Sequence, residues 1–198
     1  MWRRRRSAWR AFSLFASFSL LLVATAASAA TIAFTLEGNA GSGLRAGNEN
    51  PPVTGGSGGI LTVIEFDTTT NLLTIDIGWG SGNGFTDLTG PAVVGHIHGA
   101  TANPAPTGFS ENASPIYDLH TLAGWNPSSI SGGFDGVVAI APADVAALLG
   151  DRMYMNIHTA LNPNGEIRGH LVQVPEPTAG ALLGVGLALL ALARRSRA

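Results

Sequence analysis

Glycine limits what this chain of 198 residues can fold into. Of its 26 glycines, 23 lie between residues 31 and 173. Glycine is unfavourable inside helices and supplies the backbone angles that tight turns need, so this density leaves room only for short elements. The residues between the glycines include many Thr, Ile and Val, which favour strands. The central part of the chain therefore predicts short strands joined by tight turns.

Alternation of apolar and polar residues locates these strands. We expect them at 31–36, 60–66, 72–79, 92–98, 116–122, 133–140, 153–158 and 166–172. One helix is expected over 141–149, because Pro142 stands near its first position and Gly150 just past its end. Seven or eight strands with one short helix and no long helical period predict an all-β fold, a single antiparallel β-sandwich or barrel.

The first thirty residues have the three parts of a secretory signal peptide. Arg3 to Arg6 and Arg10 form a basic start, residues 11–24 are apolar, and Ala27-Ser28-Ala29 is a small-x-small cleavage site. We expect a signal helix over residues 1–30 that signal peptidase removes. The alternative is an amino-terminal membrane anchor, for which the apolar run is short, since a span needs about 20 residues.

The other end of the chain repeats this combination of apolar and basic residues. Residues 178–193 carry no charge and are followed by Arg194, Arg195 and Arg197. A helix of this length reaches roughly 24 Å, somewhat less than a bilayer core of about 30 Å. By the positive-inside rule the basic cluster stays cytoplasmic. We therefore expect a transmembrane helix that anchors the precursor in the inner membrane while the middle of the chain is exported.

Pro175, Glu176 and Pro177 precede this helix, and Arg194 and Arg195 follow it. In this order the three parts resemble the PEP-CTERM sorting signal. The resemblance implies that an exosortase-type membrane protease recognises and removes the tail and delivers the protein to the cell surface or extracellular matrix of a Gram-negative bacterium. A plain carboxy-terminal anchor is the alternative, and the mature protein is either released or re-attached.

Charge and cysteine content exclude several classes of function. Between residues 31 and 173 there are 12 acids and 3 arginines, a net charge of −9, and the chain has no lysine. Nucleic-acid binding needs basic side chains for phosphate contacts, so no nucleic-acid partner is expected. An acidic domain suits solubility or divalent cations. The absence of cysteine excludes disulfides and thiol chemistry.

The histidines are the candidates for chemistry. His96 and His98 flank Ile97 in the expected strand 92–98, so both imidazoles point to one face and Ile97 points to the other. His158 ends a second alternating run. Imidazoles from neighbouring strands can bind a transition metal. One interpretation is a mononuclear site for one copper (or zinc) ion at His96, His98 and His158.

Two other interpretations need no metal. The histidines can hydrogen-bond loop carbonyls or carboxylates and pin loops to the sheet, with Glu166, Arg168 and His170 forming a polar network on the last strand. They can also line a pocket for a polar ligand. A second metal site of the dismutase kind is not expected, because residues 99–115 contain no His or Asp.

Four motifs occur in order: ENPPV at 49–53, GHIHGA at 95–100, MYMNIHT at 153–159 and NPNGEIRGHL at 162–171. Together they resemble the CHRD domain, a module repeated in the animal protein chordin and found singly in bacterial exported proteins. The resemblance covers about residues 32–173 and departs at His170, where the family more often carries Gln. GHIHG also resembles the His-x-His of copper/zinc superoxide dismutase, which implies a sandwich of the immunoglobulin/superoxide-dismutase kind.

The expected organisation is a signal peptide (1–30), a CHRD domain (31–173) and a sorting tail (174–198). Nothing like the G-x-S-x-G motif of serine hydrolases surrounds a serine, so we expect no enzyme. The expected function is that of a surface or extracellular-matrix protein that binds a protein, a polysaccharide or an ion without catalysis. The alternative is a mononuclear copper-binding redox protein that uses the three histidines.

Overall fold

The computed structural model describes residues 31–126, 130–175 and 186. In this part of the chain the strands are β1 (Thr31–Glu37), β2 (Leu44–Arg45), β3 (Ser57–Asp67), β4 (Leu72–Trp79), β5 (Ala92–His98), β6 (Pro115–Asp118), β7 (Gly132–Ala139), β8 (Tyr154–Thr159) and β9 (Ile167–Gln173). Short helical turns lie between them: η1 (Ala46–Asn48), η2 (Ser81–Asn83), η3 (Thr107–Ser110), η4 (Leu119–Thr121) and α1 (Val145–Leu148).

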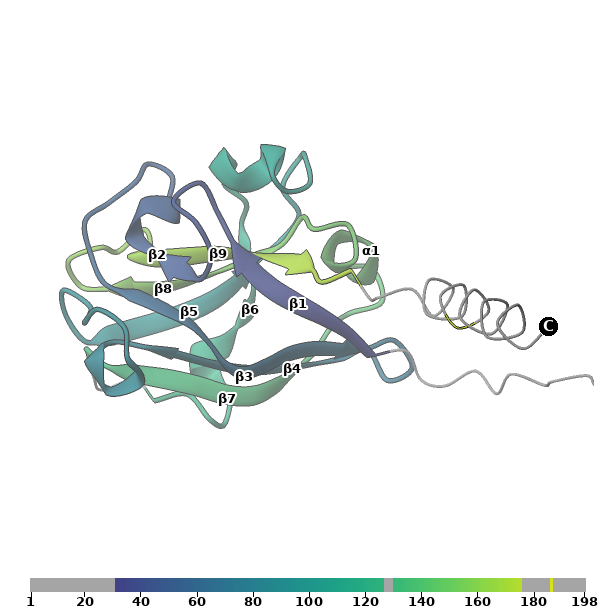
Figure 1. Ribbon diagram of the computed structural model, residues 1–198, viewed down its shortest axis with the longest axis horizontal. Coiled ribbons are helices and arrows are strands. Elements are labelled where there is room, and N and C mark those ends of the chain that lie inside the picture. Colours follow the sequence, from purple (N-terminus) through teal and green to yellow (C-terminus); the bar gives the residue numbers. More distant parts are fainter. Residues whose placement is uncertain (1–30, 127–129, 176–185, 187–198) are drawn as a thin grey trace, which may run out of the picture.

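The strands form one antiparallel sheet that folds into two layers. Its order is β6-β5-β8-β9-β1-β3-β4-β7, and β2 pairs with both β3 and β9. Strand β1 changes partner along its length, because residues 31–33 pair with β3 and residues 34–37 pair with β9. In Figure 1, β1 crosses obliquely between the layer of β3, β4 and β7 and the layer that contains β8 and β9. The predicted all-β antiparallel fold is confirmed.

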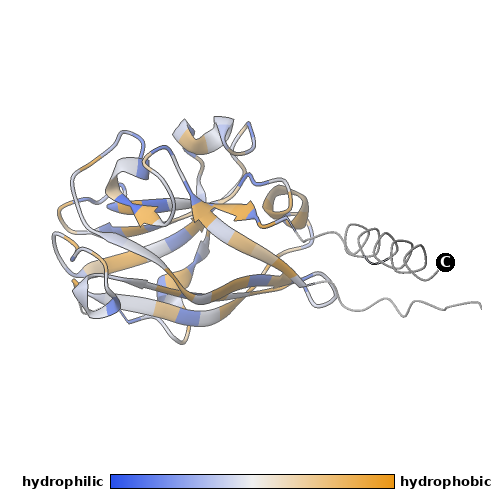
Figure 2. Ribbon diagram, in the orientation of Figure 1, coloured by the Kyte–Doolittle hydropathy of each residue, from blue (hydrophilic) through white to orange (hydrophobic). Residues whose placement is uncertain are grey.

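Apolar side chains fill the space between the layers. Ile97 of β5, Met155 and Ile157 of β8, and Ile75 and Ile77 of β4 are completely buried. Figure 2 shows hydrophobic and hydrophilic residues alternating along several strands, as expected for a sheet with one face packed on the core and the other face polar. Each such side chain contributes about 1.5–3 kcal/mol by leaving water, so the core accounts for most of the stabilisation of the sandwich.

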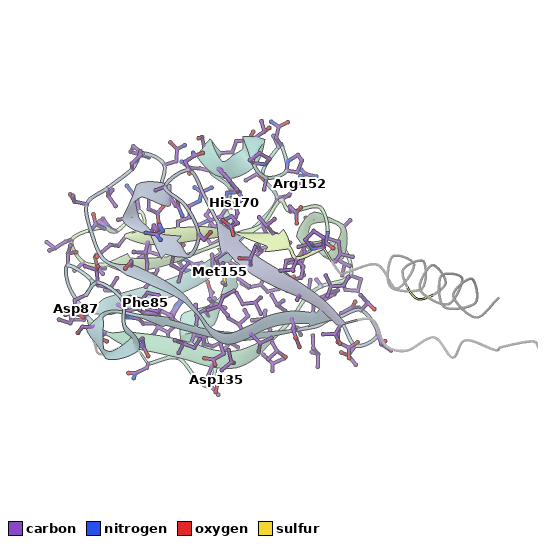
Figure 3. The ribbon with its side chains drawn as sticks, viewed as in Figure 1. Phe85, Asp87, Asp135, Arg152, Met155 and His170 are labelled. Carbon is purple, nitrogen blue, oxygen red and sulfur yellow. The ribbon has the colours of Figure 1, made fainter. Side chains whose placement is uncertain are left out.

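Strand β8 is unusual because all six of its residues are buried, on both faces. Met155 and Ile157 on its inner face are apolar, whereas Tyr154, Asn156 and His158 on the outer face are polar and covered by loops. The outer faces of β5 and β9 add further polar side chains (His96, His98, Arg168 and His170). In Figure 3 the labels of Met155 and His170 mark the inner and outer sides of this layer. The outer side therefore holds a buried polar array.

Two local predictions were wrong. The strand predicted at 116–122 ends at Asp118, and His120 lies in the turn η4, whose buried Leu119 accepts a hydrogen bond from the Leu122 amide. The predicted helix over 141–149 is only the single turn α1. Its carboxyl end is followed by Asp151 in the left-handed region (φ 53°), which stops the helix.

The predicted signal helix lies outside the described residues, as does nearly all of the predicted transmembrane helix. Among the residues that the structure does describe, no helix has both the length and the apolar character needed to cross a membrane.

Gly95 of the His-x-His motif is needed for packing. A Cβ atom at this position would lie 2.5 Å from the Trp125 ring. Trp125 in turn pairs with Phe134 of β7 through an isolated bridge, and Asn126 donates to the Gly133 carbonyl beside it. The segment after η4 therefore runs from the layer of β5 and β6 to the free edge of β7, and Gly95 makes room for its tryptophan.

We expect Gly95→Ala to lower the free energy of unfolding by about 1–3 kcal/mol, because the added methyl group must displace Trp125. Gly90→Ala is the matched control, since a Cβ atom there would meet nothing within 4 Å. Urea unfolding followed by tryptophan fluorescence measures both variants. Equal effects at the two positions would show that Trp125 does not pack on Gly95.

Candidate metal centre

Strand pairing brings the three predicted histidines together. In the ladder of β5 and β8, His96 lies opposite Asn156 and Val94 lies opposite His158. His96 and His158 are 62 positions apart in the chain, yet His96 Nδ1 lies 3.0 Å from His158 Nε2. One ring nitrogen from each of His96, His98 and His158 lies within 4.8 Å of the other two. The three histidines therefore lie on one face of neighbouring strands, as the sequence interpretation required.

Backbone carbonyls determine which nitrogen of two of these rings carries the proton. His98 Nδ1 lies 2.7 Å from the Ala113 carbonyl, and His158 Nδ1 lies 2.9 Å from the Pro163 carbonyl. A carbonyl oxygen only accepts, so Nδ1 of each ring must donate. In a neutral imidazole this leaves an unprotonated lone pair on Nε2, the arrangement found in metal-ligating histidines.

Both unprotonated nitrogens face the same oxygen. The Asn156 Oδ1 atom lies 2.9 Å from His98 Nε2 and 2.9 Å from His158 Nε2. Glu49 Oε1 and Asn156 Nδ2 both lie against Gly165, and an ionised Glu49 carboxylate attracts only the amide nitrogen Nδ2 of Asn156. This directs Oδ1 toward the histidines. Three buried acceptor atoms then face one another: His98 Nε2, His158 Nε2 and Asn156 Oδ1. A cation between them would give all three a partner.

Burial also keeps the histidines in the form that metals bind. It lowers the pKa of His96 to about 4, with a further contribution from His158 and His98. Burial likewise lowers the pKa of His98 and that of His158. The rings are therefore neutral at pH 7, and a metal ion would not have to displace a proton from an imidazolium.

The set is close to the size that a transition metal needs. Nitrogen ligands lie about 2.0–2.1 Å from copper or zinc, so two ligands of one ion are at most about 4.2 Å apart. Three ligands of one ion lie closer than this limit, about 3.4 Å apart at tetrahedral angles, so the histidine nitrogens, within 4.8 Å of one another, would have to approach by up to about 1.4 Å. Rotation of the imidazole of His96, the least buried of the three, can supply such a movement.

The predicted polar network of Glu166, Arg168 and His170 is divided in the structure. Arg168 Nη2 lies 2.9 Å from His170 Nε2, and its guanidinium carbon lies 3.4 Å from the centre of the Tyr154 ring. Glu166 is elsewhere: its carboxylate accepts from the amide and hydroxyl of Thr89 and from the Thr159 hydroxyl. Arg168 and His170 thus belong to the outer polar array, and Glu166 ties the loop at residue 89 to the end of β8.

Sequence reasoning missed Asn156, Glu49, Asp118 and His120. The period of two in MYMNIHT places Asn156 on the same face as His158, so its position could have been found. Asp118 and His120 form a second set with His96, in which the ligand atoms also lie within 4.8 Å of one another. Glu49 belongs to the ENPPV motif, but the motif indicated no role for its carboxylate, because only tertiary structure brings this loop to Asn156.

His170 should make the stability of the metal-free protein depend on pH. Burial and the nearby Arg168 lower the pKa of His170 to about 3, whereas an unfolded histidine titrates near about 6.5. The unfolded chain therefore binds more protons between these two pH values, so the free energy of unfolding falls as the pH is lowered through this window.

We expect this loss of stability between pH 7 and pH 4 to be smaller in His170→Gln, because glutamine does not titrate. Urea unfolding in the presence of a chelator at a series of pH values measures the difference. Parallel stability curves for the wild type and the variant would contradict the assignment.

Comparison with known proteins adds two matches. Residues 173–197 match the PEP-CTERM protein-sorting motif, so the precursor is exported, anchored in the membrane, processed by exosortase and sorted to the cell surface. No curated protein matches the chain significantly, and no solved structure does. The resemblance to copper/zinc superoxide dismutase therefore rests on the sequence pattern alone. Residues 40–171 match the CHRD domain, and since they make up 132 of the 198 residues, the chain belongs to the CHRD domain family.

Proposed function

We propose that this surface protein binds one divalent transition-metal ion, copper or zinc, at His96, His98 and His158, and that it does so without catalysing a reaction. The proposal rests on the Nε2 atoms of His98 and His158, which both face Asn156 Oδ1 at 2.9 Å. Of the expected ligand classes (protein, polysaccharide or ion), an ion is the one that these convergent acceptors suit.

The competing interpretation is that the histidines only pin loops to the sheet. The two Nδ1 bonds to Ala113 and Pro163 serve that purpose. A metal-free arrangement can also satisfy the remaining acceptors if the Asn156 amide rotates by 180° and donates to both rings. Its oxygen would then face Glu49, which would have to be protonated to donate to it. Burial raises the pKa of Glu49 to about 7, so at higher pH this arrangement leaves a carboxylate against an amide oxygen.

Access and charge favour the uptake of an ion. His96 keeps 15% of its side-chain surface exposed, while His98 and His158 are buried beneath loops. An ion can therefore reach the site past one ring without the core opening. The acidic domain around the site attracts cations from the medium.

We expect the wild-type protein to bind one ion at His96, His98 and His158, which we call the triad. His98→Gln and His158→Gln should each weaken binding by at least about 100-fold, since each removes a ligand nitrogen. His170→Gln is the matched control, because His170 lies on the same sheet face outside the triad. Competition against a chromophoric chelator, with copper and with zinc, measures the affinities. Equal affinity in the wild type and both ligand variants would refute the site.

The partial exposure of His96 also favours the second candidate function, a copper-dependent redox protein. A small reactant could approach a bound copper ion past this ring. The same copper-loaded samples distinguish the two functions: a redox protein would consume superoxide, or cycle with ascorbate, faster than the His98→Gln variant and faster than the equivalent amount of free copper. Our proposal expects no such excess.

The sorting tail leads to a separate prediction. We propose that in a Gram-negative host the exosortase-type protease removes the residues after Pro177, which include the apolar segment and the arginines. Mass analysis of surface-localised protein should show these residues missing, and Glu176→Ala should leave the uncleaved precursor in the membrane. An intact Arg197 in surface material would contradict the proposal.

A further inference from the structure

We propose a second metal position beside the first, formed by Asp118, His120 and the Nε2 atom of His96. It goes beyond the proposed one-ion function and depends on it only through the ring of His96, which both positions share. The sequence expectation of no second site of the dismutase kind considered residues 99–115, whereas Asp118 and His120 follow that segment. The ion would be a divalent transition metal such as zinc, because two imidazoles and a carboxylate are a ligand set that zinc accepts.

The fold brings these three residues to one place. Asp118 is the last residue of β6 and lies opposite His96 in the ladder of β5 and β6. The turn η4 then carries His120 back over β5. Asp118 Oδ1 lies 3.5 Å from His96 Nε2, and one ligand atom from each of the three residues lies within 4.8 Å of the others. Asp118 is exposed, with 58% of its side chain accessible, so this position opens to solvent.

His120 shows the same tautomer control as the histidines of the first position. Its Nδ1 atom lies 3.3 Å from the Gly95 carbonyl and must donate to it, which leaves the lone pair on Nε2. The ring stands almost perpendicular to that of His96, with the ring centres 5.3 Å apart. Thus His98, His158 and His120 each donate to a backbone carbonyl from Nδ1 and carry a lone pair on Nε2.

His96 differs from the other three. Among residues 31–126 and 130–175, its ring nitrogens contact His158 on the Nδ1 side and Asp118 on the Nε2 side, and no backbone carbonyl accepts from them. A neutral imidazole has one proton for these two contacts. An ion at the triad would occupy Nδ1 and leave the proton on Nε2, where it can donate to Asp118.

With one ion bound, Asp118 accepts a hydrogen bond from His96 Nε2, but the lone pair on His120 Nε2 has no ion to bind. A second ion would engage both residues. To hold it, His96 Nε2 would have to lose its proton to the solvent, so that Nδ1 could serve the first position and Nε2 the second. Metal ions favour such deprotonation of their ligands, and the proton lost on binding is measurable.

The test uses the full-length protein titrated with zinc, with bound ions counted by metal analysis and released protons measured in a weakly buffered solution at pH 7. We expect two ions in the wild type, the second accompanied by about one additional proton. His120→Gln should bind one ion at unchanged first-site affinity, without that additional proton. His170→Gln is the control and should behave as the wild type. The urea midpoint of each variant identifies any loss of folding.

The other outcomes separate the two proposals. One ion in both the wild type and His120→Gln would overturn the second position and leave the first intact, with Asp118 acting only to orient His96. The double variant His98→Gln/His158→Gln should keep one ion at Asp118, His120 and His96. If it keeps as many ions as the wild type, the triad is not a site and the proposed function fails. A wild type that binds no ion would overturn both.

Discussion

The hydrogen bond from an imidazole Nδ1 to a loop carbonyl is the interaction on which the polar side of this sandwich depends. It recurs at three histidines, which donate to the carbonyls of Ala113, Pro163 and Gly95. Each bond holds a loop or strand in place over the sheet, and each also leaves a lone pair on Nε2. The same contacts that cover the polar face therefore also set the tautomers that the proposed ion site needs.

Buried charge next to this face sets a second constraint. Glu49 lies beside Asn156 and is attracted by Arg168, whose guanidinium stacks on Tyr154. Such a pair contributes little net stability, because burying both charges costs about as much as their attraction returns. Its consequence is orientation: Glu49 directs the Asn156 amide, and Arg168 holds the Tyr154 ring beside His98. The charges are therefore better understood as fixing the geometry of the histidines than as stabilising the fold.

Much of the fold could be predicted from the sequence, because the alternation of apolar and polar residues along a strand is visible in the local sequence. The bounds predicted for β4 and β5 are those observed, and His96 and His98 share a face as expected. The pairing of β5 with β8 could not be derived, since register between distant strands is set by tertiary packing. Glu166 was misjudged for a related reason. It precedes the first residue of β9, so the alternation that pairs Arg168 with His170 does not extend to it.

The absence of cysteine gives the proposed metal binding a further consequence for an exported domain. Without disulfides, the loops over β5 and β8 are held by individual hydrogen bonds, each worth only about 1 kcal/mol. An ion that binds only the folded state stabilises it by about 2.7 kcal/mol when the free ion is at 100 times its Kd. The ligands come from β5 and β8, which are joined through a long intervening segment, so an ion would cross-link the sheet much as a disulfide does. Such a cross-link would form after export, where the ion is taken up from the medium, and it would stabilise the protein at the location to which its tail delivers it.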